Sequence, residues 1–478
     1  MQKSAQPDAR AVALCLAGIA AITLWRLALL PFSTAELFVD EAQYWFWGQT
    51  LDWGYYSKPP LIAWILRAAT DLGGNSPFWI HAPLALIHAG TALLLLATGR
   101  RLFGDRVGAL AGLAFATLPA VSLACLLVST DTPMLFFFAL ALYAFVRLGQ
   151  RASAGWALAM GVAVGLGLLA KYAMIYFPAS ALIAALFVRQ ARIGRRDAGI
   201  AVVAGLVTVS PNIFWNLSHD LTTLHHTADN ADWHGVRLEF GKLLEFWGGQ
   251  FAVSGPVLFG AFLVGLGGIG RDWRIRLLAL MALPALAIVS VQAILSGANA
   301  NWAAAGHLGA VLIGITVLAA RPRWLTASFA INGFLALALP VAVIFADSWR
   351  MGGNLVMARY IGMGAISTRA EAIAKREGLG VLVSPSRVLL ADEFWTLRDS
   401  GLEIYAPPPE GFPDSHYAQT HPLPPGPGEV LYVSRKARPP KGCPDARPIE
   451  TWEATEGFFV GEIGAFRVPR SCWFPDAG

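Results

Sequence analysis

Residues 80–99 read IHAPLALIHAGTALLLLATG, and Arg100 and Arg101 follow them directly. The run contains no Asp, Glu, Lys or Arg. A helix of about 20 mainly apolar residues is long enough to cross the hydrocarbon core of a bilayer. The stretch therefore predicts a transmembrane helix that ends at a pair of arginines.

The same character recurs along the chain up to residue 346. The 478 residues are 56% hydrophobic and 14% charged, whereas a soluble domain carries about a quarter charged residues. The segment after Arg10 lacks a small-residue cleavage site, so it predicts a first transmembrane helix rather than a removed signal. We predict an α-helical polytopic membrane protein with about eleven spans. The predicted spans are 11–30, 80–99, 107–127, 133–147, 155–170, 172–188, 199–217, 251–270, 275–295, 304–320 and 325–346.

Basic residues are divided unequally between the alternate loops that join these spans. Sixteen lie on the side of the N-terminus and five on the other side, a bias that marks the cytoplasmic face. We predict an inner-membrane protein with a cytoplasmic N-terminus and, after an odd number of spans, a periplasmic C-terminal region. Nucleic-acid binding is not indicated, because the arginines are spread over short loops. The larger set is Lys3, Arg10, Arg100, Arg101, Arg106, Arg147, Arg151, Arg189, Arg192, Arg195, Arg196, Arg271, Arg274, Arg276, Arg321 and Arg323; the smaller is Lys58, Arg67, Lys171, Arg237 and Lys242.

Residues 347–478 differ in character, being rich in Pro, Gly and charged residues. The string ISTRAEAIAKREG has helical spacing, while GVLVS, EVLYVS and FFVGEIGAFRV have the pattern of short strands. We predict two domains, a membrane domain at 1–346 and a small periplasmic α/β domain at 347–478. Cys443 and Cys472 lie in the second, where an oxidising compartment would allow them to pair if they lie close together.

Two loops on the predicted outer side are long, 31–79 and 218–250, and long loops on a rigid scaffold are where function concentrates. The first is rich in Trp and Tyr, which is typical of helices in the membrane interface. It carries the adjacent carboxylates Asp40 and Glu41, and later Lys58 before two prolines.

Sugar transfer from a lipid phosphate needs such residue types. A carboxylate orients or deprotonates the acceptor hydroxyl, and a cation holds the charge of the leaving phosphate. Taken singly, Asp40 and Glu41 are better explained as a solvated acidic pair, and Lys58 as a lysine that extends along the membrane interface.

The second long loop concentrates groups that could hold a metal ion. Imidazole and carboxylate ligands would suit zinc or manganese, but their spacing follows no fixed ligand pattern, so a solvated loop is the competing interpretation. The candidate ligands are His219, His225 and His226. The other residues of this kind in the loop are Asp220, Asp229, Asp232 and His234.

Two strings in the first loop, VDEAQYW at 39–45 and GYYSKPPLIAW at 54–64, resemble the periplasmic loop of bacterial family 39-type glycosyltransferases. These are relatives of protein O-mannosyltransferases and of the lipid A aminoarabinose and galacturonic acid transferases. Four later strings resemble family segments in the expected order, so the resemblance covers most of residues 30–320. They are STDTPMLFFFALALYAF, GLGLLAKYAMIYFPAS, EFWGGQFAVSGPVLF and NANWAAAGHLGAVLI.

The resemblance implies a C-type glycosyltransferase fold, a polyprenyl-phosphate sugar donor and an inverting reaction. It assigns Asp40 as the base or acceptor-orienting group, Glu41 as its motif neighbour and Asp131 as a second acidic residue. Lys58 matches the lysine that meets the carrier phosphate. Lys171 is either a second cation or an interfacial anchor. The predicted catalytic residues are Asp40, Glu41 and Asp131; the predicted donor-binding residues are Lys58, Lys171, Tyr44 and Tyr55.

The alternative function is a transporter or flippase of a lipid-linked sugar. Such proteins place ionisable groups near the bilayer midplane, whereas the predicted spans contain almost no charge apart from Arg26. The enzyme would have the lipid bilayer, the polyprenyl-phosphate donor and a periplasmic acceptor (lipid A or core, a glycan, another lipid or a protein) as partners. We predict no required cofactor, although the resemblance leaves open that a divalent cation is bound. The sequence does not select the sugar, the acceptor or the carrier length.

Overall fold

The computed structural model describes residues 9–229 and 238–474, which form two compact units. The first unit comprises Met1–Pro31 and Asp52–Val341, and the second comprises Phe32–Leu51 and Ala342–Gly478. The predicted loop 31–79 is therefore shared, because its first part belongs with the C-terminal region. Each unit is described by itself.

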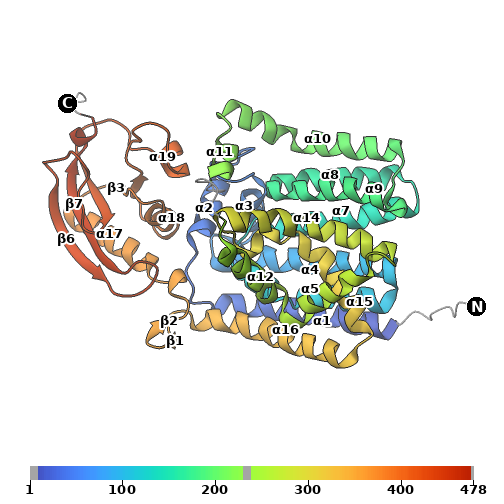
Figure 1. The fold of residues 1–478 in the computed structure, drawn as a ribbon. Coiled ribbons are helices and arrows are strands. Elements are labelled where there is room, and N and C mark those ends of the chain that lie inside the picture. Colours follow the sequence, from blue (N-terminus) through green and yellow to red (C-terminus); the bar gives the residue numbers. More distant parts are fainter. Residues whose placement is uncertain (1–8, 230–237, 475–478) are drawn as a thin grey trace, which may run out of the picture. The chain divides into compact units, whose positions relative to one another are not determined.

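The first unit is helical throughout (Figure 1). Six of its helices are long and apolar enough to cross a membrane, or seven segments if one bent pair counts as a single span, and three shorter helices are also apolar. The predicted number of eleven spans is thus not confirmed. The α-helices are α1 (Ala9–Leu29), α3 (Leu61–Gly73), α4 (Pro77–Phe103), α5 (Asp105–Ala116), α6 (Pro119–Ala124), α7 (Asp131–Gln150), α8 (Ala154–Ala170), α9 (Tyr176–Phe187), α10 (Arg195–Ser218), α11 (Thr222–Asp229), α12 (Phe240–Ser254), α13 (Pro256–Gly265), α14 (Trp273–Ser296), α15 (Gly306–Ala319) and α16 (Pro322–Ala342).

Two predicted spans are interrupted. The segment 107–127 forms α5 and α6, with Pro119 at the first turn of α6, where its missing N–H and fixed φ are tolerated. The carbonyl of Ala116 at this break accepts a hydrogen bond of 2.8 Å from the guanidinium of buried Arg26. The segment 251–270 is divided between α12 and α13, which meet at 109°. Gly255 at that bend has φ +84°, a conformation that disfavours other residues.

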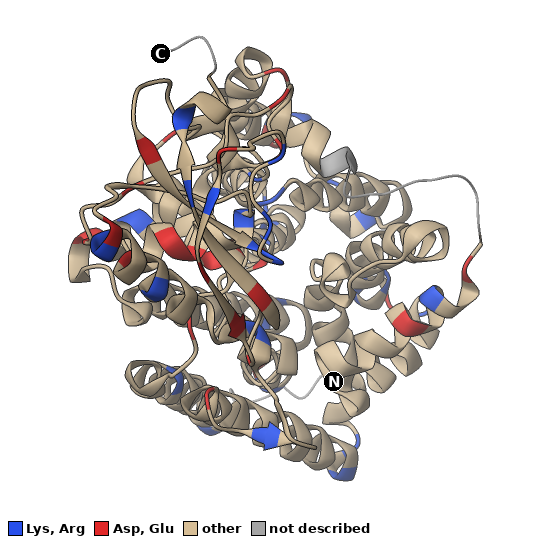
Figure 2. Ribbon diagram, turned by 90° about the vertical axis from the view of Figure 1, so that its left-hand side faces the viewer, with Lys and Arg blue, Asp and Glu red and all other residues tan. Residues whose placement is uncertain are grey.

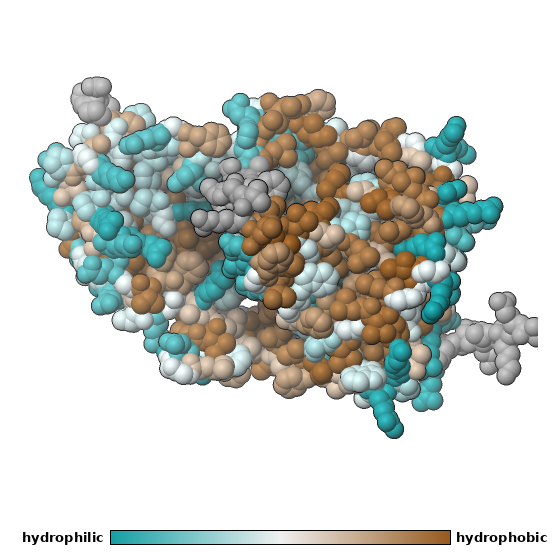
Figure 3. Space-filling view, viewed as in Figure 1, coloured by the Kyte–Doolittle hydropathy of each residue, from teal (hydrophilic) through white to brown (hydrophobic). Residues whose placement is uncertain are grey.

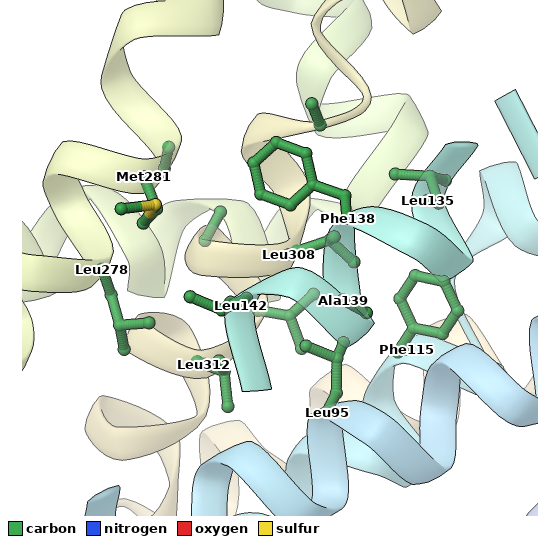
Figure 4. Close-up of a cluster of buried hydrophobic side chains, with 14 of the residues drawn as sticks. Leu95, Phe115, Leu135, Phe138, Ala139, Leu142, Leu278, Met281, Leu308 and Leu312 are labelled. Carbon is green, nitrogen blue, oxygen red and sulfur yellow. The ribbon is translucent and has the colours of Figure 1, made fainter. Parts of the chain in front are cut away.

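The core of the first unit is formed by side chains from α4, α5, α7, α14 and α15. Figure 4 shows Leu95, Phe115, Phe138, Leu278 and Leu308 among them, all almost fully buried. Helices in a bilayer gain little from hydrophobic transfer, so close van der Waals packing and small residues stabilise their contacts. Gly161 illustrates this, because a Cβ added there would lie 2.2 Å from the carbonyl oxygen of Ala201 on α10.

The outer surface of this unit suits lipid. Figure 3 shows hydrophobic side chains over much of its helical surface, and Figure 2 shows few charged residues along its helices. On α10, Val202, Val203, Leu206 and Val207 are each more than half exposed. In a polytopic membrane protein such side chains face lipid rather than water, so their exposure does not reduce stability.

The second unit combines a sheet with helices. β3 lies parallel to β4 and β5, whereas β7 is antiparallel to β5 and β6, in the order β4-β3-β5-β7-β6. The predicted helix and the three predicted strands are present as α17, β3, β5 and β7. The elements are β1 (Arg350–Met351), β2 (Asn354–Leu355), α17 (Met363–Glu377), β3 (Val381–Val383), α18 (Arg387–Thr396), β4 (Glu403–Tyr405), α19 (His416–Thr420), β5 (Glu429–Arg435), β6 (Arg447–Ala454) and β7 (Gly461–Pro469).

The helix α2 (Val39–Gln49) completes the second unit by packing against α18. Phe46 lies 4.3 Å from Phe394 and Trp45 lies 4.9 Å from Trp395, measured between ring centroids. Aromatic side chains that look like an interfacial belt in the sequence are therefore buried in a protein contact. The predicted disulfide between Cys443 and Cys472 is confirmed, with a Cα–Cα distance of 5.1 Å.

Candidate functional site

Three segments far apart in the sequence meet at Asp131 in the first unit. One carboxylate oxygen of Asp131 accepts from the ammonium of Lys171 at 2.7 Å. The other accepts from the side-chain amide of Asn301 at 3.0 Å and from the hydroxyl of Ser129 at 3.2 Å. The Asp131 side chain is only 10% exposed and that of Lys171 22%. The structure thus brings together two of the predicted residues and adds Asn301.

Local chain geometry places each of these groups. Asp131 is the first residue of α7, where the backbone N–H groups at the helix start favour a negative charge. Lys171 follows the last residue of α8, at the break before the short helix Tyr172–Ile175. Asn301 lies in another single turn, Ala300–Ala303, ahead of α15. All three therefore lie where helices begin or end.

Lys58 lies in a turn of the first unit whose backbone is tied at several points. The N–H of Tyr55 donates to the Lys58 carbonyl at 3.1 Å. The Tyr55 hydroxyl accepts from the N–H of Asp52 at 3.1 Å, and its carbonyl accepts from the Thr223 hydroxyl at 2.7 Å. Burial raises the pKa of Tyr55 to about 12. Tyr55 is thus a buried part of the turn, and its predicted contact with the donor stays a prediction.

A polar network links this turn to the region of Lys171. Asn212 on α10 donates to the carbonyl of Trp53 at 2.6 Å and accepts from the hydroxyl of Tyr172 at 2.9 Å. Asn216, one helical turn later, donates to the same hydroxyl at 3.1 Å. The turn that carries Lys58 and the residue next to Lys171 are therefore held by one pair of asparagines.

Asp40 and Glu41 lie in the second unit, in the first turn of α2. Glu41 is buried and accepts from the N–H of Phe38 at 2.6 Å, which caps the helix. Asp40 is 43% exposed and pairs with the guanidinium of Arg387 on α18, which also donates from Nε to the amide oxygen of Gln43 at 2.6 Å. Tyr44 is buried, with its ring 5.1 Å from that of Trp47.

Several buried ionisable groups share α18 and α19 with Arg387. The carboxyl of Glu393 accepts from the Ser384 hydroxyl at 2.6 Å, while its second oxygen has no hydrogen-bond partner. Burial raises the pKa of Glu393 to about 8 and that of Asp392 to about 6, and it lowers the pKa of His416 to about 3. Burial also raises the pKa of Tyr417, which has Arg387 and Asp40 among its charged neighbours.

The three described histidines of the second long loop do not form a cluster with one another. The ring of His219 stacks on Trp215 at 4.1 Å, His226 lies 5.4 Å from the ring of Tyr56, and His225 is exposed. Within residues 9–229 and 238–474, no group of three or more His, Cys, Asp or Glu side chains could hold a metal ion. Asp232 and His234 lie outside the described residues, and the side chain of Asp229 is not described.

Sequence reasoning missed Asn301, Gln43 and Arg387. Asn301 lies in the string NANWAAAGHLGAVLI, which resembles the family, but the resemblance assigned it no function. Gln43 lies in the motif VDEAQYW and was likewise given no function. Arg387 had no sequence signal, because nothing in its surroundings separates it from other arginines of the C-terminal region.

The chain is similar in sequence to known membrane glycosyltransferases. Residues 57–215 match the model of the dolichyl-phosphate-mannose-protein mannosyltransferase family. The chain is 40% identical to the lipid A galacturonosyltransferase RgtD of Rhizobium johnstonii, over 95% of this chain and 97% of that protein. It is 28% identical to the lipopolysaccharide core galacturonosyltransferase RgtB of the same organism, over 61% and 62%.

A solved structure agrees in fold. The crystal structure of ArnT from Cupriavidus metallidurans bound to undecaprenyl phosphate superimposes with a TM-score of 0.68, covering 95% of this chain and 98% of that chain. Sequence identity is 16%, so this likeness establishes the fold alone.

Proposed function

Because this chain belongs to the family 39-type glycosyltransferases, which have the C-type fold, we propose that it transfers galacturonic acid from a polyprenyl-phosphate carrier to lipid A. The chain is a membrane glycosyltransferase that uses a polyprenyl-phosphate-linked sugar donor. The observation that carries the choice of sugar and acceptor is the 40% identity to a lipid A galacturonosyltransferase across nearly the whole of both chains.

The proposed reaction is a direct displacement. The acceptor hydroxyl attacks the anomeric carbon, its proton passes to the carboxylate of Asp40, and the bond to the carrier phosphate breaks with its electron pair on the phosphate oxygen. One displacement inverts the anomeric configuration. Lys58 and Lys171 provide cations for the phosphate charge. Asp131, buried against Lys171 and Asn301, holds the lysine in place.

Four further roles belong to this proposal. Arg387 orients Asp40 through its planar guanidinium, and Glu41 holds the first turn of α2. Tyr44 and Tyr55 remain proposed donor contacts. A divalent cation at the second long loop is not needed for a displacement in which lysines neutralise the phosphate.

The topology is proposed from the distribution of arginine. We infer that the N-terminus is cytoplasmic, that residues 347–478 are periplasmic and that the reaction occurs on the periplasmic face of the inner membrane. Eleven crossings agree with this arrangement if α5–α6, the bent pair and the three shorter apolar helices each cross once. A reporter fused after Gly478 should be active in the periplasm; activity confined to the cytoplasm would contradict the topology.

Transfer by the purified protein tests the proposed function. The enzyme in lipid nanodiscs is given polyprenyl-phosphate galacturonic acid and lipid A, and the product is followed by mass spectrometry as a gain of one hexuronic acid. A matched reaction with polyprenyl-phosphate galactose tests the requirement for the sugar carboxylate. Transfer of galactose with no transfer of galacturonic acid would overturn the proposed sugar. Uronic acid release without lipid A modification would overturn the acceptor.

A further inference from the structure

A second buried polar cluster lies in the first unit, where α12, α15 and α16 meet. It comprises Gln250, Ser254, His307 and Asn332, all less than 5% exposed. His307 contacts the Ser254 hydroxyl through Nδ1 at 2.6 Å and the Gln250 amide oxygen through Nε2 at 2.8 Å. Asn332 donates to the Ser254 carbonyl at 2.9 Å. Polar side chains enclosed in this way within apolar helices call for an explanation.

The amide group of Gln250 determines which groups donate and which accept in this cluster. The Gln250 amide nitrogen lies 3.0 Å from the carbonyl of Phe246 and 3.2 Å from that of Ala300, and both carbonyls can only accept. The Gln250 oxygen must then accept from Nε2 of His307. In the neutral ring Nδ1 is left as an acceptor, so Ser254 donates to it. The hydrogen bonds donated by Ser254, His307 and Gln250 therefore follow one another toward the turn that contains Ala300.

That turn carries Asn301, which donates to Asp131. Gln250 holds Ala300, the residue directly before Asn301, and Gly249 keeps the helix close, because a Cβ added there would lie 2.8 Å from the Ala300 Cβ. The bonds thus form a continuous chain from Ser254 through His307 and Gln250 to the Ala300 turn. From the turn the chain continues through Asn301 to the carboxylate that pairs with Lys171.

We propose that Gln250 and His307 are positioning residues of the glycosyltransferase, which set the Ala300–Ala303 turn so that Asn301 holds the Asp131 carboxylate toward Lys171. This inference rests on the proposed function of Asp131 and Lys171. A buried polar chain with all its members paired has one geometry, whereas a turn held by backbone contacts alone has several. Hydrogen bonds from a second layer orient metal ligands in the same way, and their loss lowers metal affinity or activity by about 10- to 100-fold.

A double-mutant cycle tests the proposal. Gln250→Met keeps the length of the side chain without its hydrogen bonds, and Asn301→Leu removes the amide that holds Asp131. Each should lower kcat by about 10-fold or more, with a smaller change in the donor KM, and the double variant should be no slower than the slower single variant. Effects that multiply would overturn the inference, because they would show that Gln250 acts independently of Asn301.

Two further variants separate positioning from general stabilisation. His307→Gln retains an amide N–H that can donate to Gln250 and should keep activity within about 3-fold of wild type, whereas His307→Leu should match Gln250→Met. Thr98→Val is the matched control: it removes a buried hydroxyl that bonds only within its own helix, at 2.8 Å, and should leave kcat unchanged. An equal loss in Thr98→Val and Gln250→Met would also overturn the inference.

The proposed function fails by a different result. If Asp131→Asn retained full transfer, the site assignment itself would be wrong. If Asp131→Asn and Asn301→Leu were both inactive but Gln250→Met and His307→Leu were fully active, only the positioning role would be lost. Melting temperatures of all variants in detergent accompany the kinetics, so that a variant that does not fold is replaced by the milder Gln250→Asn.

Discussion

Asp131 and Asp40 are both paired carboxylates, but the two units hold them in opposite ways. Asp131 is 10% exposed, with its oxygens divided between Lys171, Asn301 and Ser129. Asp40 is 43% exposed and pairs with Arg387, itself 42% exposed. A buried pair is costly to break because the remaining charge stays desolvated, whereas an exposed pair exchanges readily with water and other partners. This difference agrees with the fixed electrostatic role that we propose for Asp131 and with the proton-accepting role that we propose for Asp40.

The largest effect should be at the two carboxylates themselves. Asp40→Asn keeps the shape of the side chain but removes the basic oxygen, so kcat should fall by about 10³-fold or more while donor binding and melting temperature change little. Asp131→Asn should lower both kcat and the melting temperature, because it leaves the half-buried Lys171 beside a neutral amide. Transfer rates, donor binding and thermal melts of the two variants make the measurement.

A double variant that removes both charges of the Asp131–Lys171 pair separates the loss of stability from the loss of activity. Asp131→Asn with Lys171→Met removes both charges of the buried pair and should recover most of the lost melting temperature without recovering activity. If Asp40→Asn proved the less stable variant, or retained near-normal transfer, the division of roles between the two carboxylates would be wrong.

Substitution of either lysine should have a smaller effect on activity. Lys58 is proposed to meet the carrier phosphate, whereas Lys171 is paired with Asp131. Lys58→Ala should raise the donor KM and lower kcat, together about 10²-fold in kcat/KM, since it removes charge that holds the phosphate in ground and transition states. Lys171→Ala should raise the donor KM less than Lys58→Ala and should also lower stability, because the charge of its ammonium is partly neutralised by Asp131. Steady-state kinetics over a range of donor concentrations distinguish the two. Identical KM effects at both positions would contradict separate roles.

Arg387 should have a still smaller effect, confined to activity. Arg387→Ala frees Asp40 and Gln43 and should lower kcat about 10-fold, with a change of at most about 1 kcal/mol in stability because the pair is exposed. Arg387→Lys retains the charge but not the fork that reaches both partners, so it should recover only part of the loss. Arg350→Ala is the control, since Arg350 pairs with Glu456 instead. A normal rate in Arg387→Ala would restrict the C-terminal region to stability or recognition.

The sequence predicted those parts of the molecule that depend on composition and local pattern. Apolar runs located the membrane helices, because a bilayer requires about 20 such residues, and strand alternation located β3, β5 and β7. The interrupted spans were not predicted, since a break at Gly255 depends on Asn332 and other distant groups. The membership of α2 in the second unit was missed for the same reason: its aromatic residues fit an interface equally well until α18 is seen beside them.

In the candidate site too, the residues within motifs were predicted, but their contacts with distant residues were not. Asp131 and Lys171 were predicted separately from resemblance, and their contact was not, because a 40-residue separation gives no local signal. Arg387 is 347 residues from Asp40, and only the fold brings the two together. Side chains that meet only through such long-range contacts lie beyond pattern analysis of a single chain, whereas residues inside a recognisable motif do not.

The smallest effect on activity, and the clearest effect of pH on stability, should come from Glu393. Its folded pKa of about 8 lies above the ordinary value of 4.5, so the folded state binds the proton more tightly than the unfolded state. The contribution of this group to stability is therefore greatest at low pH and is lost as the pH rises toward 8, by roughly 2 kcal/mol between pH 6.5 and 8. Asp392 acts in the same direction at lower pH, up to its pKa of about 6. His416 opposes both below pH 6.5, because its lowered pKa makes the unfolded state the stronger proton acceptor there.

Glu393→Gln removes this titration and should flatten the dependence of stability on pH between 6.5 and 8. The amide oxygen can still accept from the Ser384 hydroxyl, so folding and transfer at pH 7 should stay within about 2-fold of wild type. Thermal melts in detergent at pH 6.5 and 8, with hydrogen exchange in α18 to assign the transition to the second unit, make the test. Glu450→Gln is the control: hydrogen bonds from Arg369 and Arg376 lower the pKa of the half-buried Glu450, which should therefore not affect this pH range. An unchanged slope in Glu393→Gln would show that a group other than Glu393 titrates in this pH range.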